Sequence, residues 1–230
     1  MGQISHNAGS QYSLKFEQRN DIGWNWTAIT GLVVLLTLTG TGVTAAELTP
    51  IEAVKNTITE VMQILDNAEL NQPGRAAERR QRIEQVVKDR VSYEEMATCA
   101  LGIPWRELTD SERQEFVGLF IQLLRGTFVG RIDDYTGEQV LYQSEQREEQ
   151  FAEVKTKLAG PKTDTFLDFR LVNRLGKWLV YDMVIDGANI TGSYHAQFTS
   201  IIRDLSYAGL VKRMKEKVLI VKAFEMTMAP

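Results

Sequence analysis

The chain has 230 residues and a mass of 26.0 kDa, enough for one or two domains with a buried core, which excludes the disulfide-stapled mini-proteins. Apolar residues make up 43% and charged residues 24%, a globular rather than a disordered balance, and the net charge of -4 argues against nucleic acid as a partner. One cysteine, Cys99, and two histidines, His6 and His195, exclude a Cys-based zinc cluster and leave little for His-dependent chemistry.

The first predicted element is an export signal in residues 1–46. Its centre, 29–38 (ITGLVVLLTL), is an uncharged apolar run of the length of a signal-peptide h-region. Small residues follow at 43–46 (VTAA), so we expect cleavage near Ala45 or Ala46. The alternative is an uncleaved membrane anchor, because the uncharged stretch around this run could cross a bilayer of about 30 Å.

Four segments with helical periodicity follow, and three of them begin at a recognisable cap. Thr49 with Pro50 caps the first, and the capping-box patterns 92–95 (SYEE) and 109–112 (TDSE) begin the third and the fourth. The second opens with a basic stretch, 75–82, and the acidic residues Glu78, Glu84 and Asp89 are interleaved with the arginines of this helix. We interpret it as a solvated helix face rather than an anion site. The fourth segment has a wide aromatic face.

The period then changes to two, which predicts strands over 140–144, 151–158, 165–173 and 177–185. Their short connections indicate an antiparallel meander. Alternation along the last strand predicts two opposed sets: Trp178, Val180 and Val184 with Asp182 on one face, and Leu179, Tyr181, Met183 and Ile185 on the other. Both sets are largely apolar, so we expect this strand to be covered on both sides.

A closing helix with an apolar stripe over 194–205 comes next, and we expect Gly209 to break it. The predicted fold is α+β, with N-terminal helices and a C-terminal helix packed on a four-stranded antiparallel meander sheet. The predicted organisation is a signal peptide (1–46), one domain (47–217) and an apolar C-terminal tail (218–230) to which we assign no role.

Catalytic motifs are missing from the sequence: there is no phosphate loop, nucleophile elbow or paired-His metal motif. Asp168 and Asp182 could face each other across neighbouring strands as an acid and a base, but we favour the polar side of a pleat. We interpret His195 as a surface or supporting residue, and we expect a buried Cys99 thiol. We therefore expect neither an enzyme nor a metal or cofactor, and a hydrolase built on Asp168, Asp182 and His195 is the weakest alternative.

Large apolar residues are in excess on the long helices and the last strand. They are a packed core or, alternatively, the lining of a cavity between sheet and helices for acyl chains, where burial is worth about 0.8 kcal/mol per methylene. Composition does not separate the two. The candidate lipid-binding residues are Phe116, Phe120, Leu124, Phe128, Trp178, Tyr181, Met183, Ile185, Tyr194 and Phe198.

The segment 178–198 (WLVYDMVIDGANITGSYHAQF) resembles the MlaC family, also called the toluene-tolerance or Tgt-type auxiliary component of an ABC transport system. In that family a V-Y-D-V strand enters a helix through E-G-V-S, and the helix carries N-Y-R-x-Q-F. Here 180–183 (VYDM), 186–189 (DGAN) and 193–198 (SYHAQF) stand at those positions. His195 takes the place of the family's usual arginine, which leaves the headgroup preference open.

The resemblance implies a periplasmic, monomeric lipid carrier without enzymatic activity. Its cargo would be a diacyl phospholipid, moved between an outer-membrane lipoprotein complex and an inner-membrane ABC transporter with a substrate-binding ring, in support of outer-membrane lipid asymmetry. A sibling branch implies hopanoid or another polycyclic lipid as an alternative cargo. The other alternative is a scaffold of the transporter that binds no lipid.

Overall fold

The computed structural model describes residues 47–227 except 73, 134 and 162, and it does not describe the side chains of 127–134 and 221–227. These described residues pack as one compact unit. The predicted export signal and the last three residues of the predicted tail lie outside the described residues. Within the described part, no helix combines the length and apolarity needed to cross a membrane.

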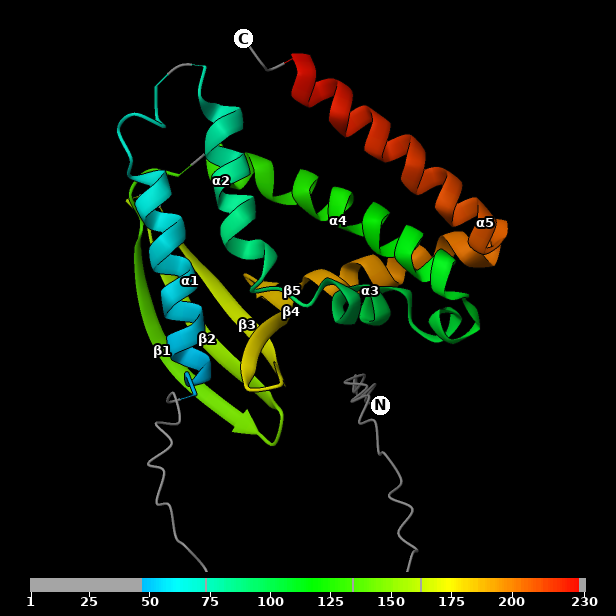
Figure 1. The fold of residues 1–230 in the computed structure, drawn as a ribbon, viewed down its shortest axis with the longest axis horizontal. Helices are drawn as coiled ribbons and strands as arrows, with labels where there is room; N and C mark the ends of the chain where they lie inside the picture. Colours follow the sequence, from blue (N-terminus) through cyan, green and yellow to red (C-terminus); the bar gives the residue numbers. More distant parts are fainter. Residues whose placement is uncertain (1–46, 73, 134, 162, 228–230) are drawn as a thin grey trace, which may run out of the picture. The chain divides into compact units, whose positions relative to one another are not determined.

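The described residues form five α-helices and one short 3-10 helix (Figure 1). The predicted cap at Thr49 is confirmed and proves to be a full capping box, and the predicted capping box at 109–112 is confirmed with nearly the same geometry. The Glu52 carboxylate accepts from Thr49 N at 2.8 Å, and the Glu112 carboxylate accepts from Thr109 N at 2.8 Å. The helices are α1 (Pro50–Leu65), α2 (Ala76–Lys88), α3 (Tyr93–Leu101), η1 (Ile103–Glu107), α4 (Asp110–Asp133) and α5 (Ile190–Thr227).

The other predicted capping box, at 92–95, is wrong. The side chain of Ser92 makes no cap hydrogen bond to α3. Instead its backbone N–H donates to Val180 O at 2.8 Å, and Val180 N donates to Arg90 O at 2.9 Å. The segment before α3 therefore pairs with the sheet edge, which fixes Ser92 in a conformation unsuited to capping.

One antiparallel sheet holds β1 (Gln139–Glu148), β2 (Phe151–Ala159), β3 (Asp164–Arg174), β4 (Lys177–Ile185) and β5 (Ala188–Asn189) in sequential order. The predicted meander is confirmed for β1 to β4. The predicted count of four strands is wrong, because the two-residue β5 turns back on the end of β4. Asp186 and Gly187 make this turn with φ of 49° and 81°, as an Asp-Gly hairpin turn requires.

A β-bulge in β4 changes which side chains share a face. Arg170 pairs with Asp182 while Leu171 pairs with Val180, so Tyr181 is the extra residue. Beyond the bulge, Met183 pairs with Phe169 and therefore lies on the same face as Val180 and Trp178. The predicted division of β4 into two strictly alternating sets is wrong for this reason.

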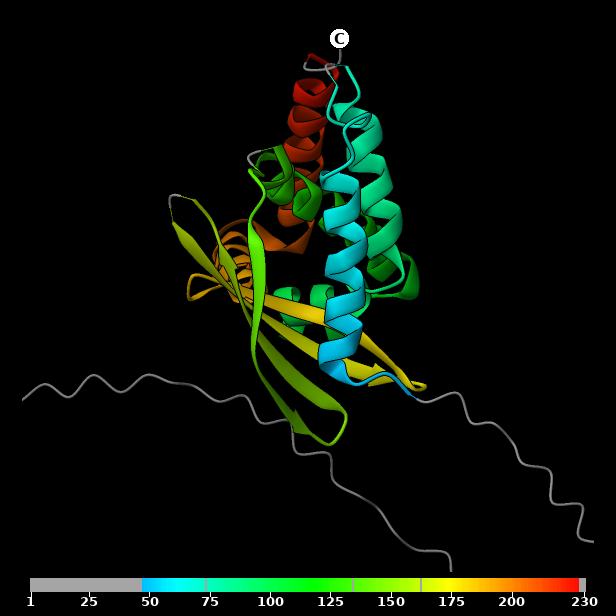
Figure 2. The same ribbon diagram turned by 90° about the vertical axis from the view of Figure 1, so that its left-hand side faces the viewer.

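Two separate apolar clusters hold the fold together. The helical core joins α3, α4 and α5, and includes Phe116, Phe120, Leu124, Tyr194 and Phe198. The sheet core joins α1 to one face of the sheet, and consists of Val54, Ala152, Val154, Leu171 and Trp178. Figure 2 shows α1 lying along the sheet, and Figure 1 shows α3, α4 and α5 together on the side of the view away from β1.

The closing helix is longer than predicted. Helical structure continues to Thr227, through most of the predicted tail, and the predicted break at Gly209 is wrong. The break is at Ser206, whose φ of 68° places it in the left-handed region, and the second half of α5 then runs back along α4 (Figure 1). Leu210, Met214 and Val218 from this half complete the helical core.

Candidate functional site

The candidate lipid-binding residues divide between the two cores. Phe116, Phe120, Leu124, Tyr194 and Phe198 are all buried in the helical core. Two pairs of their rings pack edge to face, with centroids 5.2 Å apart for Phe120 and Tyr194 and 5.7 Å apart for Phe116 and Phe198. Tyr181, the bulge residue, packs against this cluster from β4, and burial raises the pKa of its hydroxyl.

The remaining candidates lie on the other face of β4. Trp178 is buried in the sheet core, and the register places Met183 and Ile185 on the same face of the strand. Phe128 belongs to α4, but its side chain lies outside the described part of the structure. The structure therefore brings six of the candidates together on the helical side of β4 and three on the sheet side, and β4 separates the two groups.

The predicted lipid cavity between sheet and helices is not confirmed. A gap of about 30 Å³ lies between α1 and the sheet, whereas ligand pockets usually measure about 300–1,000 Å³. The sheet core is therefore closed, because this gap has room for little more than one water molecule. The lining is mostly apolar: Ala53, Val54, Thr57, Ile58, Arg90, Phe169, Leu171, Trp178 and Val180.

Trp178 is the most distinctive residue of this gap. Its side chain is 5% exposed, and the Arg147 guanidinium from β1 lies 4.9 Å from the ring centroid. The indole Nε1 is buried and donates to no acceptor among the described residues. Most buried polar groups are hydrogen-bonded, so this N–H is an exception at the wall of an apolar gap.

A larger pocket of about 420 Å³ lies where α1 ends, beside α2 and the α4–β1 connection. Its walls are mainly polar. The Tyr135 hydroxyl donates to Asp66 Oδ1 at 2.9 Å, and Arg79 Nη1 donates to Asn71 Oδ1 at 2.8 Å. Burial and the Asp66 carboxylate raise the pKa of Tyr135 to about 12, so its hydroxyl remains protonated. This lining suits polar groups and not acyl chains.

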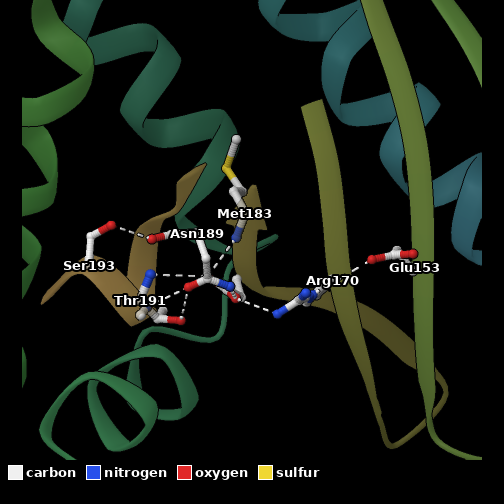
Figure 3. Close-up of polar contacts among 8 residues, drawn as sticks. Glu153, Arg170, Met183, Asn189, Thr191 and Ser193 are labelled. Carbon is white, nitrogen blue, oxygen red and sulfur yellow. Dashed lines mark hydrogen bonds and ion pairs between the residues drawn. The ribbon is translucent and has the colours of Figure 1, made fainter. Parts of the chain in front are cut away.

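The carboxylate of Asp182 ties β4 to its neighbours. The residue is 2% exposed, and its oxygens accept hydrogen bonds from Arg170 Nη1 at 3.2 Å, from Thr191 N at 3.1 Å and from the amide of Asn189. Arg170 also lies 3.7 Å from Glu153 Oε1. Figure 3 shows these partners, which come from β2, β3, β5 and the start of α5. The cluster thus anchors α5 and the sheet to one point on β4.

Asp182 therefore has a structural environment and not that of half an acid–base pair. Asp168 pairs with Val184, two positions away along the ladder, whereas Arg170 is the direct cross-strand partner of Asp182. Both carboxylate oxygens of Asp182 accept hydrogen bonds from the fold itself, so neither is directed at a substrate. Among the described residues there is no cluster of histidine, cysteine or carboxylate side chains able to hold a metal ion.

His195 supports the end of α3. Its Nδ1 lies 3.2 Å from Ala100 O, and because a carbonyl oxygen only accepts, Nδ1 carries the hydrogen. The ring also packs on Gly102, where a Cβ would lie 2.6 Å from His195 Cε1. These contacts agree with the predicted supporting role. Cys99 lies on α3 but is exposed, so the predicted burial of its thiol is wrong.

Sequence reasoning missed three arginines that border the site: Arg90, Arg147 and Arg170. Each comes from a segment whose charge is ordinary for a solvated strand or loop. Arg170 could have been identified only from the strand register that pairs it with Asp182. That register depends on the bulge at Tyr181, which the sequence pattern does not predict.

One family model matches most of the described part of the chain. The family model described as "MlaC protein" matches residues 55–216. Among solved structures, a phospholipid-binding protein from Ralstonia solanacearum, determined in complex with a phospholipid, superimposes with a TM-score of 0.68 at 22% sequence identity. The match covers 74% of this chain and 97% of that one, and at this identity it establishes a shared fold. No curated protein matches the chain.

Proposed function

The chain belongs to the MlaC protein family, and on that premise we propose that it is a periplasmic carrier that shuttles a diacyl phospholipid between the outer membrane and an inner-membrane ABC transporter. The family match over residues 55–216 is the observation that carries this proposal. The structural relative from Ralstonia solanacearum supports it, because a chain of the same fold was solved with a phospholipid bound. The partners would be the transporter's substrate-binding ring and an outer-membrane lipoprotein complex.

The acyl chains would lie between α1 and the sheet. The described part of this interface is apolar, and several of its side chains, including Ile58, Phe169 and Val180, are only partly buried. Movement of α1 away from the sheet would enlarge the gap of about 30 Å³ and expose apolar surface for the acyl chains to cover. Trp178, Met183 and Ile185 would contribute to this surface from β4.

The helical core would act as the fixed wall behind β4. Phe116, Phe120 and Phe198 are each at most 3% exposed, and their rings pack against one another. Separating them would therefore create a cavity, at a high cost in free energy. The cluster around Asp182 holds β4 and α5 to this wall. Loading and release would then need only a change in the position of α1, without covalent chemistry.

Native mass spectrometry of the protein purified from a periplasmic extract, followed by lipid extraction, tests this function. We expect a monomer that carries one diacyl phospholipid. A hopanoid in the extract would assign the chain to the sibling branch instead. A homogeneous lipid-free mass, with no lipid taken up from vesicles, would contradict the carrier function.

A scaffold that binds no lipid is the second candidate, and the closed sheet core is the observation that favours it. A scaffold would bind the inner-membrane complex and remain empty. The two functions therefore differ in a single measurable quantity, the stoichiometry of bound lipid, while both allow binding to the transporter.

A further inference from the structure

The indole N–H of Trp178 is a buried hydrogen-bond donor on a residue that lines the apolar gap between α1 and the sheet. Its Nε1 is inaccessible to solvent and unpaired among the described residues. The surrounding lining offers few polar side chains, Thr57 and Arg90, and these already pair with each other, with Arg90 Nη1 donating to Thr57 Oγ1 at 3.1 Å. Leaving such a donor unpaired is unfavourable, so a ligand that brings an acceptor to it gains affinity.

The position of Trp178 restricts which acceptor can reach it. On one side the indole borders the apolar lining formed by Val54, Leu171 and Val180. On the other side the exposed guanidinium of Arg147 stacks on its ring at 4.9 Å. An acceptor here must therefore have a long apolar group attached to it and an anionic group close by.

An acyl ester of a glycerophospholipid has this arrangement of groups. Its carbonyl oxygen accepts hydrogen bonds and donates none, and it joins the apolar chain to the glycerol that bears the phosphate. The carboxylate of Glu145, on the same strand as Arg147, already accepts a hydrogen bond from Ile51 N at the start of α1, at 2.8 Å. Arg147 is the charged side chain that lies over the indole ring, and its positive charge suits a phosphate.

We propose that Trp178 Nε1 donates a hydrogen bond to the acyl-ester carbonyl of the bound phospholipid, and that this residue makes the site selective for ester-linked over ether-linked lipids. The proposal rests on the proposed function, since it requires phospholipid in the sheet core. It adds a residue that distinguishes two lipids of equal length, charge and headgroup. An ether-linked lipid lacks this carbonyl oxygen, and its remaining ether oxygen is a weaker acceptor, so the indole N–H is left poorly paired.

The test compares dissociation constants of diacyl and dialkyl phosphatidylglycerol with equal chain lengths, measured on the purified protein by displacement of a fluorescent lipid. We expect the protein to bind the diacyl lipid about tenfold more tightly, a difference typical of one buried hydrogen bond. In Trp178→Phe, which keeps the ring and removes the donor, the preference should disappear. Equal affinity of the unsubstituted protein for both lipids would overturn the proposal and leave the carrier function intact.

Trp105→Phe is a matched control. Trp105 is also a buried tryptophan under an arginine, with Arg113 lying 5.6 Å from its ring centroid, but it belongs to the helical core. Its substitution should leave the ester preference unchanged. A preference that survives in Trp178→Phe, or disappears in Trp105→Phe, would also overturn the proposal.

A second measurement does not require the substitution to fold. The indole N–H proton of Trp178, observed by NMR in the unsubstituted protein, should shift downfield when diacyl lipid binds and shift much less with dialkyl lipid. An identical response to both lipids would contradict the assigned hydrogen bond. If neither lipid binds at all, the proposed function fails together with this inference.

Discussion

The helical core and the sheet core differ in how completely they are packed. In the helical core Phe116, Phe120 and Leu210 are fully buried, and four aromatic rings interlock. In the sheet core only five of the described residues are buried, and the rest of the interface with α1 is half-exposed. One core is thus complete without a ligand, while the other retains a gap and an indole N–H that is unpaired among the described residues. If the chain carries a lipid, as proposed, this difference favours the sheet core over the helical core as its site.

The largest expected effect comes from truncating the helical core. Phe120→Ala should lower the free energy of unfolding by about 3–5 kcal/mol, because a fully buried ring is lost and its neighbours cannot close the space. Ile58→Ala in the sheet core should cost about 2 kcal/mol or less, since Ile58 is half-buried. Urea unfolding measures both changes.

Lipid binding should respond in the opposite order. Folded Phe120→Ala should keep the phospholipid affinity of the unsubstituted protein, whereas Ile58→Ala should weaken it. If Phe120→Ala lost lipid binding while Ile58→Ala kept it, the acyl chains would belong in the helical core and the comparison would be reversed.

Asp182→Asn tests the cluster that joins the two cores. We expect a loss of about 3 kcal/mol in stability, because the substitution leaves Arg170 without its buried ionic partner and turns an amide N–H toward other donors. Asp168→Asn is the matched control on the neighbouring strand and should change stability by about 0.5 kcal/mol or less. Equal effects of the two substitutions in thermal unfolding would refute the assigned role of Asp182.

Gly102→Ala should cost about 1–3 kcal/mol, since the residue has a φ of 72° and its new methyl would meet the His195 ring. In a His195→Ala background the contact with the ring disappears and only the backbone cost should remain, because a φ of 72° with a ψ of -138° is a conformation adopted almost only by glycine. A double-mutant cycle measures the difference. An additive cycle would mean that the ring does not press on Gly102.

The two matching capping boxes allow α1 and α4 to be weakened equally. Thr49→Ala and Thr109→Ala should each cost about 1 kcal/mol, since each removes one side-chain cap. Only Thr49→Ala should speed lipid uptake from vesicles, because it loosens the helix that must move. Equal uptake rates for the two variants would argue against the movement of α1.

The smallest expected effect is a change in how stability depends on pH. Hydrogen bonds from Thr49 hold the pKa of Glu52 below its ordinary value of 4.5, and those from Thr109 do the same for Glu112. Because the folded pKa is lowered, each cap stabilises its helix above pH 4.5 and loses this contribution as the pH falls through the folded value. Glu52→Gln and Glu112→Gln should each flatten the fall in stability measured between pH 5 and about pH 3.

The predictable parts of the fold depend on local patterns. Caps at Thr49 and Thr109 and the change of period near residue 140 are visible in the sequence. The bulge at Tyr181 and the bend at Ser206 are not, because each is set by packing between distant segments. The bulge at Tyr181 caused the wrong division of β4 into faces, and the bend at Ser206 caused the wrong position of the break in α5.

The candidate site was predicted less completely for the same reason. Periodicity identifies apolar faces but not which of them meet, so it combined Phe116 and Trp178, which belong to different cores. Arg147 stacks on Trp178 from a strand far away in the sequence, and no local pattern indicates that pairing.

The most direct test of lipid binding in the sheet core is photocrosslinking with a phospholipid that carries a diazirine in one acyl chain, followed by peptide mapping. We expect crosslinks on α1, β3 and β4, at residues of the sheet core and its half-buried border such as Ile58, Phe169 and Val180. Crosslinks confined to Phe116, Phe120 and Phe198 would place the lipid in the helical core and contradict this assignment.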